Sequence, residues 1–295
     1  MKKIIGVILL SLLSLMGCKK SDKPTLLVPG GSPLISVAGI LDEFDAEVTA
    51  GPSLIPSEFI KGEKDIIIAP VIVGAKLHIL GSSKYQLAAV IGFSNLHIAS
   101  RTPLNSIDDL KGKTIHAFGE HATPGIVLKT VLKDQDTTIE WGNDVQEMMI
   151  PFNSGNAEYA LIAEPLLTVL RQKLTEDIYT LSLKDIFPTD IIQVGVFINP
   201  SSSINLDKTI KSIKSNIAYL KENPETYAHE IIDVHQQLTN LKETVIANAI
   251  PNLDLNYQPA LTIKASIESF FQILNEANEE LLKNKLPDQS FYYER

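Results

Sequence analysis

Short apolar runs alternate with stretches of helical spacing along most of the chain after Pro24. Such runs are typical of buried strands, and apolar residues three and four positions apart are typical of helices that cover them. Thr25–Leu41 combines a short strand pattern, a glycine-bearing turn, Ser-Pro and an apolar helical pattern, and Thr114–Leu132 repeats this order with Thr-Pro. The alternation predicts an α/β architecture.

A second unit follows each of these segments. Asp65–Pro70 and Glu158–Pro165 both read as buried strands that end in a proline, and an apolar helical pattern follows each of them. Because the order strand, capped helix, strand-proline, helix occurs twice, we expect two pseudo-symmetric lobes. Between the halves, Leu87–Ile91 and Leu96–Ser100 have the pattern of strands.

The last third of the chain has helical periodicity. One apolar face runs from Ile210 to Leu220 before Pro224, and a second runs from Ile263 to Leu274. We interpret these faces as core packing that returns to cover the first lobe. The chain is expected to cross between the lobes near Ala99–Pro103 and again near Val196–Pro200.

The N-terminus has the pattern of an exported protein. Two lysines precede the apolar stretch Ile4–Met16, which is shorter than the ~20 apolar residues of a membrane-spanning helix. The stretch ends in LMGC, which resembles the lipobox of bacterial lipoproteins, although Met16 departs from the residues usual at its position. We therefore expect a lipoprotein signal peptide at residues 1–17, lipidation of Cys18 and a polar tether over residues 18–23. An ordinary signal peptide with an incidental cysteine is the alternative.

Charge and cysteine content narrow the function. The net charge is −9, and loss of residues 1–17 with their two lysines changes it to −11. An acidic chain with three arginines is a poor nucleic-acid binder. Cys18 is the only cysteine, so the chain has no disulfide and no thiolate metal site. Its length is more typical of two domains than of one.

Four stretches resemble the type 2 periplasmic-binding-protein family, and most closely its branch that binds nitrate, sulfonates, taurine and thiamine precursors. They read VPGGSPL, KGEKDIIIAPVIVGAKL, SIDDLKGKTIHAFGEHATPGIVLKTVL and YALIAEP. DLKGKTI followed by a strand and a Thr-Pro helix start is the most specific of these. The resemblance implies a two-lobed α/β fold whose lobes are joined by two crossings and clamp a ligand between them. Lobe 1 would comprise residues 24–100 plus 201–295, and lobe 2 residues 101–200.

The resemblance also implies a place in the cell and a set of partners. Such a protein delivers a small molecule to the permease and ATPase complex of an ABC importer, here from a lipid anchor on the extracytoplasmic face of the cell membrane. It acts as a monomer and needs no cofactor, metal or catalytic residue. The branch suggests a heterocyclic vitamin precursor or a sulfonate-like compound as the ligand.

The cleft would be built by loops at the carboxyl ends of the strands, where ligands of open α/β sheets bind. Two of these loops open helices whose free amides favour an anionic or hydrogen-bond-accepting group. The carboxyl-end rule selects four loops, and the polar turn Phe93-Ser94-Asn95 near the first crossing is a fifth candidate. In the family, the loop that matches Glu164 faces the cleft. The candidate ligand contacts are Gly31, Ser32, Pro70, Asn95, His121, Thr123 and Glu164.

Each candidate has a structural alternative. Ser32 and Thr123 are also suited to cap their own helices, and Gly31 to permit a tight turn. Glu164 and His121 could be solvated loop residues. The four loops hold no arginine, the usual bidentate partner of sulfonate and carboxylate, although Arg101 lies at the first expected crossing. This absence leaves room for a neutral or zwitterionic heterocycle.

Two other function classes compete with the importer. An enzyme on the same fold, such as a pyrimidine synthase or a chorismate-dehydratase-like lyase, would need a positioned acid or base, for which the candidates are Glu120, His121 and Glu164. The chain has no Ser-His-Asp signature and no phosphate-binding P-loop. A lipid-anchored sensor that binds ligand without transport is the third class.

Overall fold

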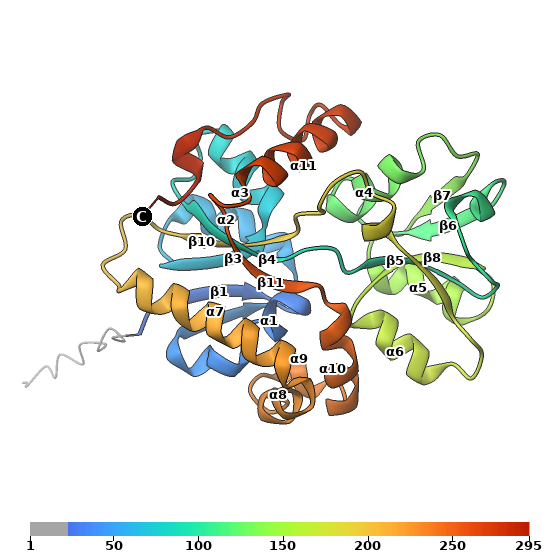
Figure 1. The fold of residues 1–295 in the computed structure, drawn as a ribbon, viewed down its shortest axis with the longest axis horizontal. Helices are drawn as coiled ribbons and strands as arrows, with labels where there is room; N and C mark the ends of the chain where they lie inside the picture. The colour runs from blue at the N-terminus through green and yellow to red at the C-terminus, as the bar shows by residue number, and fades with distance from the viewer. Residues whose placement is uncertain (1–22, 295) are drawn as a thin grey trace, which may run out of the picture.

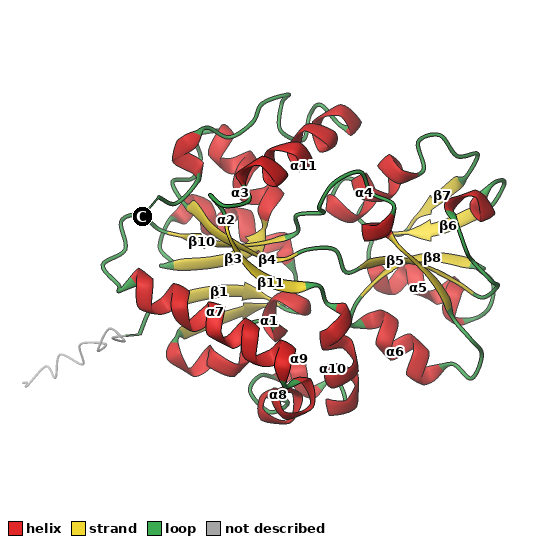
Figure 2. Cartoon of the chain, viewed as in Figure 1, coloured by secondary structure: helices red, strands yellow, loops and turns green. Residues whose placement is uncertain are grey.

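The computed structural model describes residues 23–294, so the expected signal peptide, Cys18 and all of the tether except Lys23 lie outside the described residues. Two lobes, each built on one β-sheet with helices against it, form an elongated molecule (Figures 1 and 2). Within the described residues, no helix is both long enough and apolar enough to span a membrane.

The sheet of lobe 1 has six strands. Its three neighbouring strands β2, β1 and β3 are parallel, whereas β10 runs antiparallel to β3 and β4, and β11 antiparallel to β4. Alternate residues of β1 face opposite sides, and Leu26, Leu27 and Val28 are all fully buried, as in a sheet covered on both faces. In spatial order the strands are β2 (Asp45–Thr49), β1 (Thr25–Pro29), β3 (Ile66–Pro70), β10 (Val194–Ile198), β4 (Gln86–Gly92) and β11 (Leu255–Pro259).

The sheet of lobe 2 repeats this plan with five strands. β7, β6 and β8 are parallel, and β5 runs antiparallel to both β8 and β9. In each sheet, the strand that arrives from the other lobe runs antiparallel beside the third parallel strand: β10 beside β3 in lobe 1, and β5 beside β8 in lobe 2. The predicted pseudo-symmetry of the two halves is confirmed. In spatial order the strands are β7 (Thr138–Trp141), β6 (Thr114–Ala117), β8 (Tyr159–Ala163), β5 (Leu96–Ser100) and β9 (Tyr179–Ser182).

Helices cover both faces of the lobe 1 sheet. One face carries α2 (Ile55–Lys61), α3 (Val71–Ile79) and α11 (Lys264–Ala277). The other carries α1 (Ser32–Ile35), α7 (Leu206–Glu222), α8 (Pro224–Ile231), α9 (Gln236–Thr239) and α10 (Glu243–Ala249), together with the 3₁₀ helices η1 (Ala38–Glu43) and η5 (Ile250–Asn252). The short helices η2 (Pro52–Leu54) and η6 (Gln289–Phe291) complete the lobe.

The C-terminal helices cover lobe 1 as predicted. Ile213, Ile217 and Leu220 of α7 are buried on one face of the sheet, and Ile267, Phe270, Phe271 and Leu274 of α11 on the other. The pattern of this region did not predict β11, which ends in Pro259. A proline is tolerated there because β11 is an edge strand.

Lobe 2 is smaller and packs its helices in the same way. α4 (Thr123–Val131) covers the face that carries Ile98 and Leu161, whereas α5 (Val145–Asn153) and α6 (Leu166–Lys173) cover the opposite face. The 3₁₀ helix η3 (Ile107–Leu110) has a capping box of Ser106 and Asp109, and η4 (Leu183–Asp185) precedes the return to lobe 1.

The expected lobe boundaries are wrong by about one strand at each crossing. β5 pairs with β8 and β9 in lobe 2, so the chain first crosses at Phe93-Ser94-Asn95. β10 pairs with β3 and β4 in lobe 1, so the chain returns just before Val194. Local periodicity shows that a strand exists but not which sheet receives it. Lobe 1 is therefore residues 23–92 plus 194–294, and lobe 2 lies between the crossings at residues 96–192.

Candidate functional site

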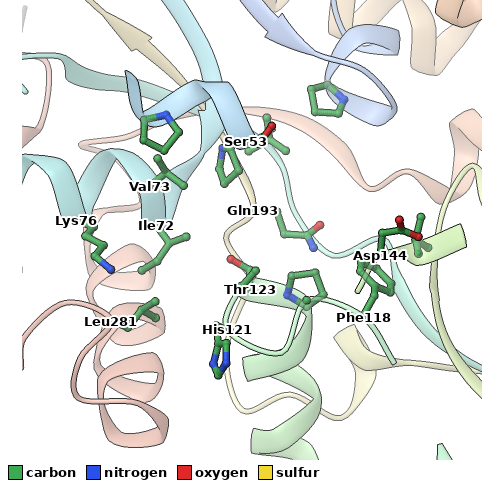
Figure 3. A pocket seen from close by; sticks show the side chains of 18 of the residues that line it. Ser53, Ile72, Val73, Lys76, Phe118, His121, Thr123, Asp144, Gln193 and Leu281 are labelled. Carbon is green, nitrogen blue, oxygen red and sulfur yellow. The ribbon is translucent and has the colours of Figure 1, made fainter. Parts of the chain in front are cut away.

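A cavity of about 1050 Å³ lies between the lobes, at the carboxyl ends of the parallel strands (Figure 3). Both lobes and both crossings contribute to it, and most of its wall is apolar. Lobe 1 supplies residues of α1, α2 and α3, and lobe 2 supplies the loops before α4 and α5. The lining residues are Ser32, Pro33, Ser53, Pro56, Pro70, Ile72, Val73, Lys76, Leu77, Asn95, Phe118, Gly119, His121, Ala122, Thr123, Pro124, Asn143, Asp144, Val145, Gln193, Val194 and Leu281.

Most of the candidate contacts meet at this cavity although they come from distant parts of the chain. Ser32, Pro70, Asn95, His121 and Thr123 all line it. Gly31 and Glu164 are absent from the lining. Three of the four loops selected by the carboxyl-end rule therefore converge on the cavity, whereas the Glu164-Pro165 loop does not line it.

The two helix starts differ from the expected caps. Gly31 and Ala122 occupy the N-cap positions, so Ser32 and Thr123 are the first helical residues, and neither N-cap makes a side-chain capping bond. Gly31 has a φ of 83°, which explains the glycine there. Since Thr123 does not cap α4, its hydroxyl has no hydrogen-bond partner among the described residues and is available at the cavity.

Asn95 ties the two lobes together at the first crossing. Its side-chain Nδ2 donates to the Glu164 carbonyl at 3.1 Å in lobe 2 and to Ser32 Oγ at 3.5 Å in lobe 1. Its backbone N–H donates to Gln193 Oε1 at 3.4 Å, which links it to the second crossing. Asn95 is only 6% exposed. It is therefore both part of the cavity wall and a fixed point between the lobes.

Glu164 is buried beneath α6 and does not face the cavity. One carboxylate oxygen accepts from the backbone N–H of Thr168 at 3.1 Å, and the other, Oε1, has no hydrogen-bond partner among the described residues. Burial raises the pKa of the Glu164 carboxyl above its ordinary value, and the bonds to Thr168 oppose this only in part. The carboxylate thus serves α6 rather than a ligand in this conformation.

Glu164→Gln is expected to raise the melting temperature at about pH 7.5 and to lose this advantage near about pH 4. A carboxyl whose folded pKa is raised contributes stability below its unfolded pKa, and that stability disappears as pH rises through the folded pKa. Glutamine removes the buried charge and keeps an acceptor for Thr168. Thermal unfolding at both pH values tests this, with the exposed Glu279→Gln as control. An unchanged or lower melting temperature at the higher pH contradicts it.

The residues considered for acid–base chemistry do not form a cluster. Glu120 pairs with Lys129 at 3.0 Å and lies 3.8 Å from His121, whose side chain is 82% exposed, whereas Glu164 is buried outside the cavity lining. Over residues 23–294 no group of three or more His, Cys, Asp or Glu is placed to hold a metal ion.

Arg101 does not reach the cavity. Its guanidinium donates to the Phe152 carbonyl and pairs with Glu176 within lobe 2. The guanidinium carbon also lies over the Phe152 ring, 5.1 Å from the ring centroid. The cation at the cavity is instead Lys76, on the second turn of α3.

The loops alone did not point to Lys76 or Gln193. Lys76 follows Ile72 by four positions, so the helical spacing places both on the cavity side of α3. Gln193 directly precedes β10, and its carbonyl accepts from the Val71 N–H at 2.9 Å. Gln193 could have been identified from a correct position of the second crossing. Lys76 could have been identified only by predicting which face of the helix after Pro70 points toward the cavity.

No protein-family model matches the chain, and no curated protein matches it either. Solved structures do. An ABC transporter from Parabacteroides distasonis matches with a TM-score of 0.79 and 20% identity, covering 93% of this chain and 100% of that one. The periplasmic aliphatic sulphonate-binding protein SsuA of Escherichia coli matches with a TM-score of 0.68 and 14% identity over 93% of each chain.

A second sulfonate-binding structure gives the same result. The alkanesulfonate-binding protein SsuA of Xanthomonas axonopodis pv. citri, bound to MOPS, matches with a TM-score of 0.66 and 15% identity, covering 92% of this chain and 99% of that one. At these identities the likeness shows the fold and does not extend to the ligand. The chain therefore has the two-lobed α/β fold of these periplasmic binding proteins, which is the fold that the sequence resemblance implied.

Proposed function

We propose that the chain is an extracytoplasmic binding protein that captures a small molecule in its cleft and presents it to an ABC importer. The observation that carries this proposal is the cavity of about 1050 Å³ lined jointly by both lobes and both crossings. Its size is near the upper end of small-molecule sites, which are typically about 300–1,000 Å³ and mostly apolar with a few polar groups. The solved structures of the same fold include proteins named for sulfonate binding.

The mechanism that follows is closure of the lobes around the ligand. A ligand that touches both walls binds the closed arrangement better than the open one, and this difference in affinity shifts the population. The two lobes already touch through their helices: α11 of lobe 1 packs against α4 of lobe 2, and α10 of lobe 1 packs against α6 of lobe 2. These are the contacts that would change as the lobes close. Near the crossings, Lys184 of lobe 2 pairs with Asp254 of lobe 1 at 2.8 Å.

A thermal-shift screen with vitamins, pyrimidines, sulfonates and amino acids tests the proposal. A ligand present at 100 times its dissociation constant adds about 2.7 kcal/mol to the free energy of unfolding. We expect at least one class to give a saturable rise in melting temperature. A chain that responds to no class is inconsistent with a binding protein for these solutes.

The lipid anchor is part of the same proposal and is supported by the sequence around Cys18. Cys18→Ala is expected to move the protein from the membrane fraction to the soluble fraction, because the thioether-linked lipid can no longer be attached. Fractionation of cells that express each form measures this, with Ser21→Ala in the tether as the matched control. If the Cys18→Ala protein stays with membranes as the parent does, the anchor does not depend on this cysteine.

A further inference from the structure

Lys76 is an unpaired cation on an apolar wall. Its side chain lines the cavity from α3, is exposed, and forms no ion pair or hydrogen bond with any residue of the described chain. In Figure 3 it lies with Ile72 and Leu281 on one side of the cavity, opposite Phe118 and Asp144. When a ligand excludes water from such a wall, the attraction between this ammonium and an anion becomes stronger than in bulk water.

The acidic residue of the cavity lining, Asp144, already accepts hydrogen bonds from the backbone. Asp144 caps α5, and its Oδ1 accepts from the backbone N–H groups of Gln146 and Glu147, both at 2.8 Å. A carboxylate in this position is stabilised by the helix N-terminus and is not displaced at low cost. Lys76 therefore lacks a counter-ion within the cavity.

Two further polar groups line the cavity, one at the start of α4 and one at the second crossing. Thr123 is 7% exposed, and its hydroxyl lines the cavity without a hydrogen-bond partner among residues 23–294. It stands at the start of α4, a nine-residue helix whose first amides lack intrahelical partners. Gln193 also lines the cavity (Figure 3), and its Oε1 accepts from the Asn95 backbone N–H, which leaves its side-chain amide N–H groups as donors.

The two polar positions are separated by an apolar stretch. The Gln193 carbonyl is bonded to the N–H of Val71, the first residue of α3, and Lys76 is five positions further along that helix. Five residues at 1.5 Å per residue give a separation of about 7.5 Å along the helix axis. Ile72 and Val73 lie between Val71 and Lys76 on this helix and line the cavity, as do Phe118 and Pro124 of lobe 2.

We propose that the cleft selects an elongated, largely apolar monoanion with two polar ends. Its anionic end pairs with Lys76 on α3, and its uncharged hydrogen-bonding end meets Thr123 at the start of α4 and Gln193 at the second crossing. Lysine offers a point charge rather than a bidentate fork, so the site accepts any compact anionic group at that end. This inference rests on the proposed function and adds the ligand class and the residue that selects it.

Isothermal titration with four probes of one chain length tests the inference: octanoate, octanamide, octylammonium and ω-hydroxyoctanoate. We expect ω-hydroxyoctanoate to bind most tightly and octylammonium most weakly. Lys76→Met keeps the length of the side chain and its helix propensity. It should weaken binding of both anions by about tenfold, corresponding to ~1.4 kcal/mol, and leave octanamide unchanged. Thr123→Val should weaken ω-hydroxyoctanoate but not octanoate, and unchanged melting temperatures of both variants confirm folding.

The result that overturns the inference is equal binding of octanoate by the parent and by Lys76→Met, or equal binding of octanoate and octylammonium by the parent. Failure of all four probes also overturns it. This failure is distinguishable from failure of the proposed function, because the broad thermal-shift screen would then still identify a ligand of another class. Only a negative screen as well would count against the binding protein itself.

Discussion

Phe197→Ala is expected to lower the free energy of unfolding by about 3–5 kcal/mol. Phe197 is fully buried in β10, the strand that enters lobe 1 from the second crossing. Its ring lies 5.0 Å from that of Phe59 on α2 and 6.0 Å from that of Phe291 near the C-terminus. One side chain therefore joins the sheet, a covering helix and the end of the chain, and its removal leaves a cavity that these elements can fill only in part.

The backbone around Phe197 is shaped to its ring. A Cβ added at Gly74 of α3 would lie 2.3 Å from the Phe197 ring, so the helix approaches the strand only because residue 74 is glycine. Urea unfolding of the parent and the variant measures the effect, with Ile60→Ala, a truncation at a side chain that is 60% exposed, as the control. A loss below about 1 kcal/mol for Phe197→Ala would contradict this account of the core.

Gly125→Ala is expected to lower the free energy of unfolding by about 1–3 kcal/mol and to weaken ligand binding at least tenfold. A Cβ at this position would lie 2.3 Å from the Gly119 carbonyl oxygen and 2.7 Å from the Glu120 Cα. Both are backbone atoms, so no side-chain rotation relieves the clash. The loop before α4 must move; this loop carries His121 to the cavity and leads directly into Thr123.

The matched control for Gly125→Ala is Gly51→Ala, because a Cβ at Gly51 meets nothing within 4 Å. Thermal unfolding without ligand and titration with a ligand from the screen separate the effect on stability from the effect on the site. Parent-like values in both measurements would show that the loop before α4 adapts without loss, and that its position does not determine binding.

Much of the fold could be predicted because it depends on local patterns. The strands Leu96–Ser100 and Leu87–Ile91, the proline at the start of α4 and the apolar face of α7 all follow from spacing and backbone chemistry. The repeated order of elements predicted two similar sheets, which the topology confirms. What local patterns do not encode is the sheet to which a strand belongs. For this reason both crossings were misplaced.

The site could be predicted at the level of loops but not of every side chain. Ser32 and Thr123 reach the cavity because the carboxyl ends of parallel strands meet there. Glu164 follows such a strand as well, yet its carboxylate accepts from Thr168 in the first turn of α6 and is buried. The direction of the Glu164 side chain therefore depends on its hydrogen bond to the backbone of Thr168, four residues further along the chain. Lys76 was missed because it lies inside a helix, outside any loop.

Titration of a ligand from the screen against three proteins tests the central claim most directly: the parent, Val73→Trp and Ile60→Trp. Val73 lines the cavity on α3, so tryptophan there fills space that the ligand needs, whereas Ile60 is 60% exposed and outside the cavity lining. The account predicts one ligand per chain for the parent and for Ile60→Trp, and no measurable binding for Val73→Trp. Equal affinity of Val73→Trp and the parent would show that the ligand binds somewhere other than the cleft.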